Sequence, residues 1–284
     1  MNMFFAELGD EDFERFKALI YSESGIKLSD MKKSLVKARL TKRLRLLKID
    51  TFTEYYDYLV KNFNEEKYNF VNAITTNKTD FFREIKHFEF LRDVCLPEFI
   101  ESGKKELRIW SAGCSTGEEP YTIAISLLEF FENQKVRPDI KILATDIDTS
   151  VLERASEGIY NWEHVKDIDT RILKKYFLRG KDENEGLFKI KGNIKKMVTF
   201  RRLNLHDERY PMKKIFDLIF CRNVIIYFDK ESQKNLFNKI HHYLDDYGYL
   251  FIGHSENLAS VTRKFKLVGN TIYKKNLLML DLND

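Results

Sequence analysis

The 284-residue sequence contains only three cysteines, Cys95, Cys114 and Cys221, and they lie far apart. They form no C-x-x-C pair, and no histidine is close enough to them in the sequence to suggest a zinc site. A sparse, odd set of cysteines is typical of a reducing compartment rather than of a disulfide-bonded secreted domain. The cysteines therefore predict a cytoplasmic protein without a metal.

Long apolar runs are also missing. No run approaches the roughly 18–20 apolar residues that a membrane span needs. The first residues, MNMFFAELGDEDFERF, are acidic and lack both a basic segment and a cleavage site, which argues against a signal peptide. With 43% hydrophobic and 32% charged residues, the composition predicts a globular protein without membrane insertion. The length allows one large domain or two of ordinary size.

Proline is missing from the first third of the chain, up to Pro97, and this stretch also shows no strand pattern. Apolar residues recur there at helical spacing in four segments, which predicts four amphipathic helices, the first ending at Gly25. The expected N-terminal caps, in chain order, are Asp10, Ser29, the capping box of Thr51 with Glu54, and Asn64. Residues 1–76 are therefore expected to form an all-α domain, separate from an α/β domain over residues 77–284.

A net charge of +4 is mild, but the positive charge is concentrated. Residues 30–48 contain eight Lys or Arg and one acid. The predicted helix in this region is either a solvated face or an electrostatic dock for an acidic partner, such as a glutamate-rich helical protein or a nucleic-acid backbone. The sequence does not choose between these alternatives.

Residues 107–125, LRIWSAGCSTGEEPYTIAI, combine a short apolar run, a loop of small residues and a helical pattern. Such a unit lets the backbone approach a ligand, and the helix N-terminus presents unpaired N–H groups. The spacing is not the G-x-G-x-x-G dinucleotide fingerprint, and Glu118 and Glu119 would repel a pyrophosphate. S-adenosylmethionine suits the loop better, because it has an ammonium, a sulfonium and a ribose. The alternative is an ordinary βα turn.

A second strand is expected at residues 140–145, directly followed by Asp146 and Asp148. An acid at this point binds ribose hydroxyls in folds of this type, although either aspartate is also suited to cap the next helix. Later predicted strands also end in polar residues, at Asn204 with Leu205 and at Arg222 with Asn223. These strand ends should converge with the first loop at one edge of the sheet.

The junction between the two predicted domains, TTNKTDFFRE (75–84), is polar and then aromatic. Thr79 or Asp80 is expected to cap a helix that continues through His87, with Arg83 one turn into it. Arg83 is either an ordinary surface arginine or part of a site, since clefts form at domain boundaries.

Residues 188–190 and 194–200 are two apolar runs separated by Gly192 and Asn193, which predicts a β-hairpin. This hairpin would be a small antiparallel β-insertion at about residues 180–200, either a recognition surface or an edge decoration. A second Gly-Asn turn, in FKLVGNTIYKK, predicts a hairpin that closes the sheet. The whole pattern predicts an α/β fold of the class I, Rossmann-like methyltransferase type, preceded by the all-α domain.

Five motifs, TTNKTDFFRE, SAGCSTGEEPY, ATDIDTSVLERA, FCRNVIIYFD and GHSEN, together resemble the CheR family of chemotaxis receptor glutamate O-methyltransferases. The resemblance covers nearly the whole chain in order. It departs from the commoner family pattern at Gly113, Cys114 and Thr122, which carry no implied role. It implies methyl transfer from S-adenosylmethionine to glutamate side chains of the receptors, giving methyl esters and S-adenosylhomocysteine, without a metal.

The resemblance also implies roles for individual residues. Catalytic positions beside the transferable methyl would be Arg83 and Tyr227. Cofactor contacts would be Asn77, Thr79, Arg83, Glu118 or Glu119, Asp146, Asn204, Leu205, Arg222 and Asn223. The basic helix 30–48 and the β-insertion would face the cytoplasmic helical domain of the receptors, and in some members the insertion binds a receptor's C-terminal pentapeptide. A monomer is expected.

The chemistry agrees with the lack of an obvious Ser/His/Asp or Cys/His set. A glutamate with a pKa of about 4.3 is already ionised at pH 7, so no general base is needed. One alternative is a signalling module that binds S-adenosylmethionine without turnover. A nucleic-acid methyltransferase is less favoured, because a D/N-P-P-Y/F motif is missing, and a nicotinamide dehydrogenase does not fit the glycine spacing.

Overall fold

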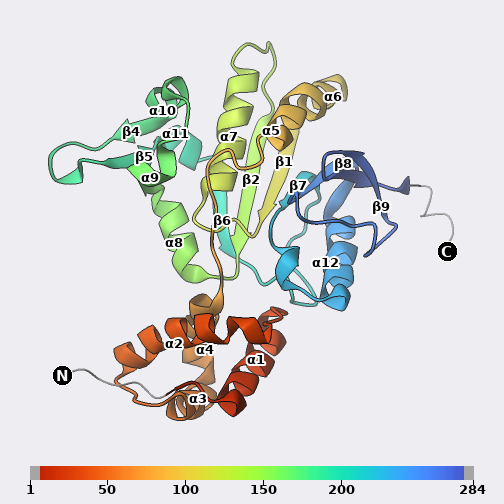
Figure 1. The fold of residues 1–284 in the computed structure, drawn as a ribbon. Helices are drawn as coiled ribbons and strands as arrows, with labels where there is room; N and C mark the ends of the chain where they lie inside the picture. The colour runs from red at the N-terminus through yellow and green to blue at the C-terminus, as the bar shows by residue number, and fades with distance from the viewer. Residues whose placement is uncertain (1–6, 278–284) are drawn as a thin grey trace.

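The computed structural model describes residues 7–277, which form a helical domain and a larger α/β domain. Figure 1 shows the helical domain, in red and orange, below one end of the main sheet. The expected combination of an all-α N-terminal domain with a Rossmann-like domain is confirmed. Residues 1–6 of the acidic N-terminal segment and residues 278–284 of the second predicted domain lie outside the described residues. Within residues 7–277, no helix is both long and apolar enough to cross a membrane.

The N-terminal domain packs its helices around a core of their own. Its elements are α1 (Asp10–Ser24), the 3-10 turn η1 (Asp30–Lys32), α2 (Lys33–Leu47), α3 (Phe52–Lys61) and α4 (Phe63–Ile74). The four predicted helices are thus confirmed. Phe16, Leu40, Tyr55 and Phe70, one from each helix, are completely buried, because each helix turns its apolar face inward.

The capping box of α3 is confirmed, since Thr51 Oγ1 accepts from Glu54 N at 3.2 Å and Glu54 Oε2 accepts from Thr51 N at 3.1 Å. Gly25 ends α1 with a φ of 70°. Three expected caps are wrong: Gly9 rather than Asp10 precedes α1, η1 rather than α2 follows Ser29, and Asn62 rather than Asn64 precedes α4. Polar residues are frequent before each helix, and the local sequence does not show which one takes the extended backbone of a cap.

The main sheet has seven strands in the order β6-β2-β1-β7-β8-β10-β9. They are β1 (Glu106–Ala112), β2 (Asp139–Asp146), β6 (Val198–Arg202), β7 (Phe216–Cys221), β8 (Leu244–Ile252), β9 (Phe265–Gly269) and β10 (Ile272–Lys275). The first five in this order are parallel, and β10 is antiparallel to both neighbours, which confirms the closing hairpin. The connections run in opposite directions from β1 and β7, and open α/β sheets bind ligands at such a point.

Helices cover both faces of this sheet, because successive strand residues point to opposite sides. Ile109 packs in the cluster that includes α7, whereas the next residue, Trp110, packs in the cluster that includes α12. The helical elements of the α/β domain are α5 (Lys86–Phe90), the π-turn η2 (Leu91–Cys95), α6 (Leu96–Glu101), α7 (Glu118–Phe131), α8 (Thr149–Glu157), α9 (Trp162–Val165), α10 (Thr170–Tyr176), η3 (Asp182–Asn184), α11 (Gly192–Lys195), η4 (Ile225–Tyr227) and α12 (Lys230–Tyr243).

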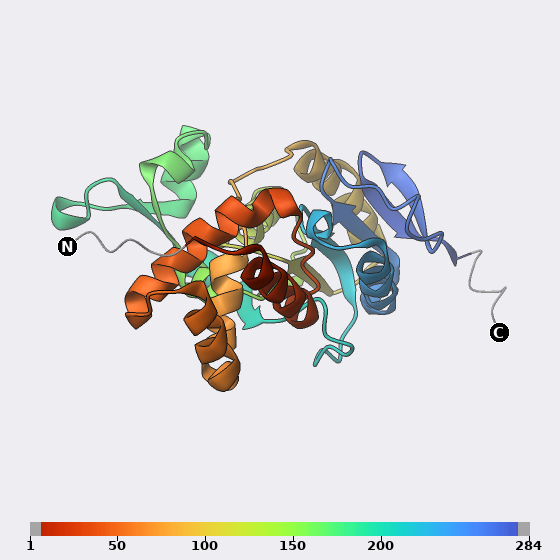
Figure 2. The same cartoon turned by 60° about the horizontal axis from the view of Figure 1, so that its bottom comes forward.

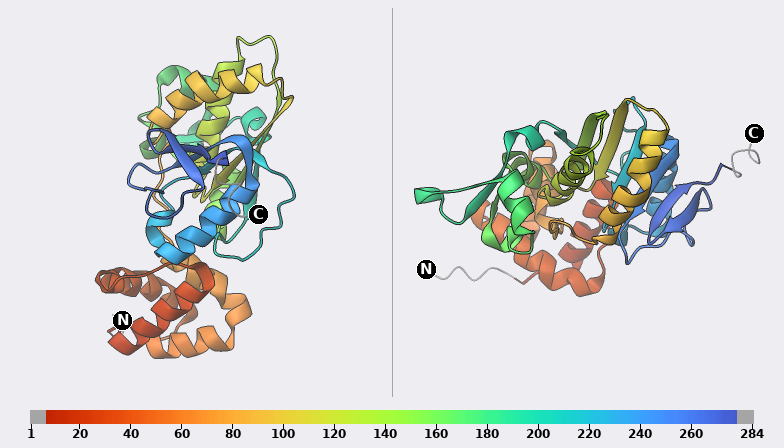
Figure 3. Two further views of the ribbon diagram at one scale, coloured as in Figure 1. Left: turned by 90° about the vertical axis from the view of Figure 1, so that its right-hand side faces the viewer. Right: turned by 90° about the horizontal axis from the view of Figure 1, so that it is seen from above.

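The antiparallel insertion exists, but the predicted hairpin at about 180–200 is wrong. A separate three-stranded sheet has the order β3-β5-β4 and consists of β3 (Ile159–Asn161), β4 (Phe177–Arg179) and β5 (Leu187–Ile190). The expected turn at Gly192 and Asn193 begins α11 instead, and β6 joins the main sheet beside β2. Figures 2 and 3 show this small sheet on the side of the molecule opposite β9 and β10. An alternating apolar pattern predicts a strand without showing its partner, so the sequence paired β5 with the wrong neighbour.

The predicted helix around Arg83 is also wrong. Residues 75–85 form a loop with a turn at Phe81 and Phe82, and α5 begins at Lys86. Phe82 and Glu84 have φ angles of 54° and 58°, which are incompatible with a right-handed helix. The loop is held in place by tertiary contacts, such as the hydrogen bond from Phe82 N to Thr122 Oγ1. These contacts override the local capping signals.

Several basic side chains of α2 bind within the protein rather than facing solvent. Arg43 Nε donates to Glu66 Oε1 at 2.6 Å, and the Glu66 side chain is only 2% exposed. Tyr55 also donates to Glu66 Oε1, at 3.0 Å. Arg39 donates to the carbonyl oxygen of Thr75 at 2.7 Å. Part of the basic pattern of residues 30–48 is therefore structural.

Arg43→Ala should lower the free energy of unfolding by about 2–3 kcal/mol, because it leaves the Glu66 carboxylate buried without its cation. The value is below that of a fully buried pair, since Arg43 is partly exposed and Tyr55 still donates. Lys42→Ala, on the exposed face of the same helix, should change stability by less than about 0.5 kcal/mol. Urea unfolding followed by circular dichroism measures both, and equal losses would contradict a structural role for Arg43.

Candidate active site at the carboxyl edge of the sheet

A cavity of about 470 Å³ lies where the carboxyl ends of the strands meet the junction loop and the helical domain. It is formed by loops that follow β1, β2, β6 and β7, together with residues 74–80 and the segment after α1. The candidate residues that line it are Asn77, Thr79, Arg83, Glu119, Asp146, Asn204, Leu205, Arg222, Asn223 and Tyr227. The structure thus brings together all of the sequence-predicted site residues except Glu118.

The loop after β1 is fixed by contacts with the end of β2. Gly113 N and Cys114 N both donate to the carbonyl oxygen of Thr145, at 2.8 and 2.9 Å. Gly113 has a φ of 85°, and a Cβ there would lie 2.5 Å from Val224 Cγ2, so a larger residue does not fit. The expected strand, small-residue loop and helix are confirmed.

Asp146 and Asp148, the two aspartates after β2, have different roles in the structure, whereas the sequence left open which of them caps the next helix and which faces a ligand. Asp148 caps α8, since its Oδ1 accepts from Ser150 N and Val151 N. Asp146 lines the cavity, and its two oxygens accept from Ser115 N at 2.8 Å and from Asp148 N at 3.0 Å. Burial raises the pKa of Asp146 to about 6, although these N–H groups lower it. Each oxygen keeps acceptor capacity, which suits a ligand with hydroxyl groups.

Glu118 and Glu119 are neighbours at the start of α7, but their surroundings differ. Glu119 lines the cavity, accepts from Ser111 Oγ at 2.6 Å and pairs with Arg222 NH1 at 3.1 Å. Burial raises the pKa of Glu119, and the Arg222 guanidinium opposes this shift. Glu118 is completely buried and accepts from Thr116 Oγ1 at 2.7 Å, while its other oxygen has no partner in the described part of the chain. The geometry favours Glu119 as the ligand-facing carboxylate.

Arg222, at the end of β7, connects the parts of the site. Its side chain is 2% exposed, and it pairs with Glu119 on α7 and with Glu84 in the junction loop, at 3.1 and 3.0 Å. It also donates to the carbonyl oxygen of Arg83. Burial alone would raise the pKa of Glu84, but the His254 N–H and the Arg222 guanidinium hold that pKa below its usual range. The sequence pattern carried no signal for Glu84, because its partners are remote in the chain.

Arg83 and Tyr227 reach the cavity from two segments that are far apart in the sequence, the junction loop and the turn η4. Arg83 lies between Phe82 and Glu84, which both have left-handed backbones, and its NH1 donates to the carbonyl oxygen of Lys78 at 3.1 Å. Tyr227 ends the 3-10 turn η4, directly after the loop that follows β7. Both side chains are partly exposed and line the cavity, so a second molecule can reach them.

The helical domain completes the wall of the cavity. The sequence did not predict this contact between the two domains. Ile26 forms an isolated antiparallel bridge with Phe228, and Lys27 N donates to the carbonyl oxygen of Tyr227 at 2.8 Å. Asn204 Nδ2 donates to the carbonyl oxygen of Glu23 at 2.8 Å. These are contacts between backbones or to a backbone, so residue types near Gly25 gave no sign of them.

Glu118→Gln tests the electrostatics of the loop. Burial raises the pKa of Glu118 from 4.5 to about 7, so the folded protein binds more protons than the unfolded chain between these values. Stability due to Glu118 therefore falls as the pH rises from 4.5 to 7. The variant should be more stable than the parent by about 2–3 kcal/mol at pH 8 and nearly equal to it at pH 4.5. Urea unfolding at both pH values measures this, with the exposed Glu153→Gln as control.

A Glu118→Gln variant that is less stable than the parent at pH 8 would show that the buried carboxylate has a stabilising partner.

Comparisons with known proteins agree with this geometry. The family model described as "CheR methyltransferase, SAM binding domain" matches residues 77–274, and "CheR methyltransferase, all-alpha domain" matches residues 11–75. The chain is 44% identical over 271 residues to the chemotaxis protein methyltransferase of Borreliella burgdorferi, covering 94% of each protein. It is 42% identical to that of Salmonella typhimurium, covering 94% of this chain and 90% of the relative, and 41% identical to that of Escherichia coli, covering 94% and 91%.

The residues that line the cavity fit S-adenosylmethionine, the cofactor named in the family description. Asp146 offers acceptor oxygens for hydroxyls, Glu119 offers a negative charge for a cationic cofactor, and Leu205 adds apolar wall. The chain is an S-adenosylmethionine-dependent methyltransferase with an all-α N-terminal domain, and it belongs to the CheR methyltransferase family.

Proposed function

We propose that this protein methylates glutamate side chains in the cytoplasmic helical domain of chemotaxis receptors. The observation that carries the proposal is that Arg83 and Tyr227 line the same cavity as Asp146 and Glu119. A guanidinium and a phenol are donors for a carboxylate, whereas the two acids suit a cationic, hydroxyl-bearing cofactor. The names of the curated relatives support a chemotaxis substrate.

The proposed cofactor contacts follow from the lining of the cavity. Asp146 would accept from the ribose hydroxyls, and Glu119 would face positive charge. The remaining proposed contacts are Asn77, Thr79, Arg83, Asn204, Leu205, Arg222 and Asn223. Of these, Arg222 acts mainly through others, since its donors are already bound to Glu84, Glu119 and the Arg83 carbonyl. When bound, the cofactor supplies a methyl group on a cationic sulfur.

The side chains of the site would orient the substrate rather than activate it. A glutamate with a pKa of about 4.3 is ionised at pH 7, so forming its ester needs no proton transfer to the protein. The planar fork of Arg83 matches the two oxygens of a carboxylate. Too strong a pair would weaken the nucleophile, so a partly exposed arginine and a neutral tyrosine hydroxyl suit the task. Positioning of this kind is worth up to roughly 7–11 kcal/mol in well-oriented systems.

A groove between α2 and α8 is the proposed path for the receptor helix. It is lined by Arg39, Lys42, Arg43 and Arg154 and reaches Thr79, which also lines the cofactor cavity. The groove therefore joins helix 30–48 to the site. Because Arg39 and Arg43 are already bound within the protein, and Asp80, Asp148 and Glu163 also line the groove, Lys42 and Arg154 are the side chains that we propose for an acidic helical partner.

Not every basic residue is available for that partner. Lys33 pairs with Asp10 and Lys37 with Glu7, in addition to the Arg43–Glu66 pair. In the insertion, Lys191 and Lys195 donate to backbone carbonyls, whereas Lys189 and Lys196 are exposed. We propose the insertion as a second receptor contact through these exposed lysines. A cytoplasmic monomer, with a helical domain over residues 1–76 and a catalytic domain over 77–284, completes the proposal.

Arg83→Ala should lower the methyl-transfer rate by roughly 100-fold and Tyr227→Phe by roughly 10-fold, because each removes a donor that orients the carboxylate. Both variants should keep much of the parent's affinity for S-adenosylmethionine, whereas Glu119→Gln should lower that affinity. Transfer of radiolabelled methyl to purified receptor cytoplasmic fragments gives the rate, and titration calorimetry gives the affinity. Lys42→Ala tests the groove. It should raise the KM for the receptor fragment more than it lowers kcat, because Lys42 is proposed to contact the receptor and not the reacting groups.

The chemistry of the label distinguishes the alternatives. Label that is released from the receptor by mild base supports a methyl ester on glutamate. Label on DNA would favour a nucleic-acid methyltransferase, and binding of S-adenosylmethionine without any transfer would favour a signalling module. Full activity in both Arg83→Ala and Tyr227→Phe would remove these residues from the mechanism.

A further inference from the structure

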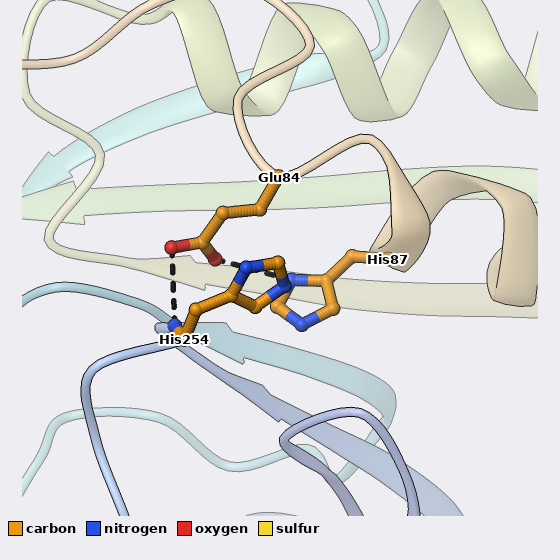
Figure 4. Close-up of side chains that lie close together, drawn as sticks. All are labelled: Glu84, His87 and His254. Carbon is orange, nitrogen blue, oxygen red and sulfur yellow. Dashed lines mark hydrogen bonds and ion pairs between the residues drawn. The ribbon is translucent and has the colours of Figure 1, made fainter.

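Three potential metal ligands, Glu84, His87 and His254, meet from the junction loop, the start of α5 and the loop after β8 (Figure 4). Their ligand atoms all lie within 4.8 Å of one another. Glu84 Oε2 lies 3.5 Å from His87 Nδ1, and the rings of His87 and His254 are edge to face with centroids 4.9 Å apart. His87 is completely buried, whereas His254 is exposed and lies at the protein surface.

The hydrogen bonds of His87 show which ring nitrogen carries the proton. Nε2 lies 3.0 Å from the carbonyl oxygen of Asn270, which only accepts. It also lies 3.0 Å from Thr271 Oγ1, whose own proton goes to the same carbonyl oxygen, so both contacts are satisfied when Nε2 donates. Nδ1 of the neutral ring then carries a lone pair, and this lone pair is next to Glu84 Oε2. Among the described residues, Nδ1 is one of the buried side-chain atoms without a hydrogen-bond partner. Two acceptors therefore face each other in a buried contact.

A bridging cation is needed to make this contact favourable. A metal ion that accepts electron pairs from both atoms satisfies the same contact. The surroundings match a metal site, since a ligating histidine usually donates its other N–H to a backbone carbonyl, and a ligating carboxylate is itself hydrogen-bonded. Asn270 and Arg222 supply these two contacts.

We propose that Glu84, His87 and His254 bind a divalent transition metal of the zinc class, separate from the cofactor of methyl transfer. Two imidazoles and one carboxylate are a ligand set that zinc takes, with a water completing the tetrahedron on the exposed side of His254. Magnesium and calcium prefer oxygen ligands and do not suit two histidines. The sequence predicted no metal, because that prediction rested on the spacing of the cysteines. His254 is 170 residues from Glu84 in the chain, so their proximity leaves no local pattern.

The affinity should be lower than that of a structural zinc site. Arg222 already donates to Glu84 Oε2 at 3.0 and 3.2 Å, so the metal and the guanidinium share one oxygen and repel each other. The three cysteines are buried, which leaves no thiol among the described residues to compete at the surface. The ion would tie the junction loop, α5 and the loop after β8 together and should therefore stabilise the folded state.

Titration calorimetry with Zn²⁺, on full-length protein first treated with a chelator, tests the site at pH 7.5. One equivalent should bind to the parent, and His254→Ala should bind it at least ten times more weakly. This variant keeps the backbone N–H that donates to Glu84, and the substituted side chain is exposed, so it should fold normally. His242→Ala, which removes an exposed histidine on α12, is the matched control and should bind like the parent.

Two further measurements use the same proteins. Co²⁺ should give intense visible absorption bands with the parent and His242→Ala, as expected for nitrogen and oxygen ligands in a tetrahedral site, and not with His254→Ala. Zn²⁺ should raise the Tm of the first two proteins only. Parent-like zinc binding by His254→Ala, or no stoichiometric binding by the parent, would overturn the proposal. Methyl transfer is not measured, so the result is independent of the proposed function.

Discussion

The guanidinium of Arg222 is the contact on which the arrangement of the site depends. It is buried at the end of β7 and binds α7 through Glu119 and the junction loop through Glu84 and the Arg83 carbonyl. Burying one charge is costly unless it is paired, and here two carboxylates compensate for it. Of the two carboxylates, Glu119 lines the cavity, where it offers a negative charge to a cationic cofactor.

The same pairing explains an unusual backbone at the junction. Phe82 and Glu84 both adopt positive φ, a conformation that costs non-glycine residues free energy. The cost is offset because the Glu84 carboxylate accepts hydrogen bonds from Arg222, Asn223 and the backbone of His254. Arg83, between the two strained residues, therefore projects into the cavity from a rigid loop. A helix at this position, as the capping signals suggested, would have turned it elsewhere.

The parts of the site that the sequence predicted are those that depend on local order. A strand, a small-residue loop and a helix must place Gly113 and Glu119 at the carboxyl edge, and the acid after the next strand follows by topology. Strand partners could not be predicted in the same way. The run at 187–190 carries the right alternation, but its partners lie 9–13 residues earlier in β4 and 26–30 residues earlier in β3.

Side chains whose partners are remote in the sequence were the hardest part of the site to predict. Glu84 and His87 are ordinary polar residues until Arg222 and His254 are placed beside them, and no spacing in the sequence records that proximity. The sequence also did not show which of Glu118 and Glu119 faces the cavity. On a helix, adjacent residues are turned by about 100°, so one faces the cavity and the other packs under the loop, but the starting angle is a tertiary property.

The backbone contacts between the helical domain and Tyr227 have a consequence for how this enzyme is divided. The bridge from Ile26 to Phe228 and the bond from Lys27 N to Tyr227 O make the first domain part of the wall that holds the proposed substrate-facing tyrosine. The two domains fold around separate cores, but neither encloses the cavity alone. The two domains therefore have separate cores but share the wall of one cavity. Exchange of one domain between relatives would have to preserve the fit at this seam.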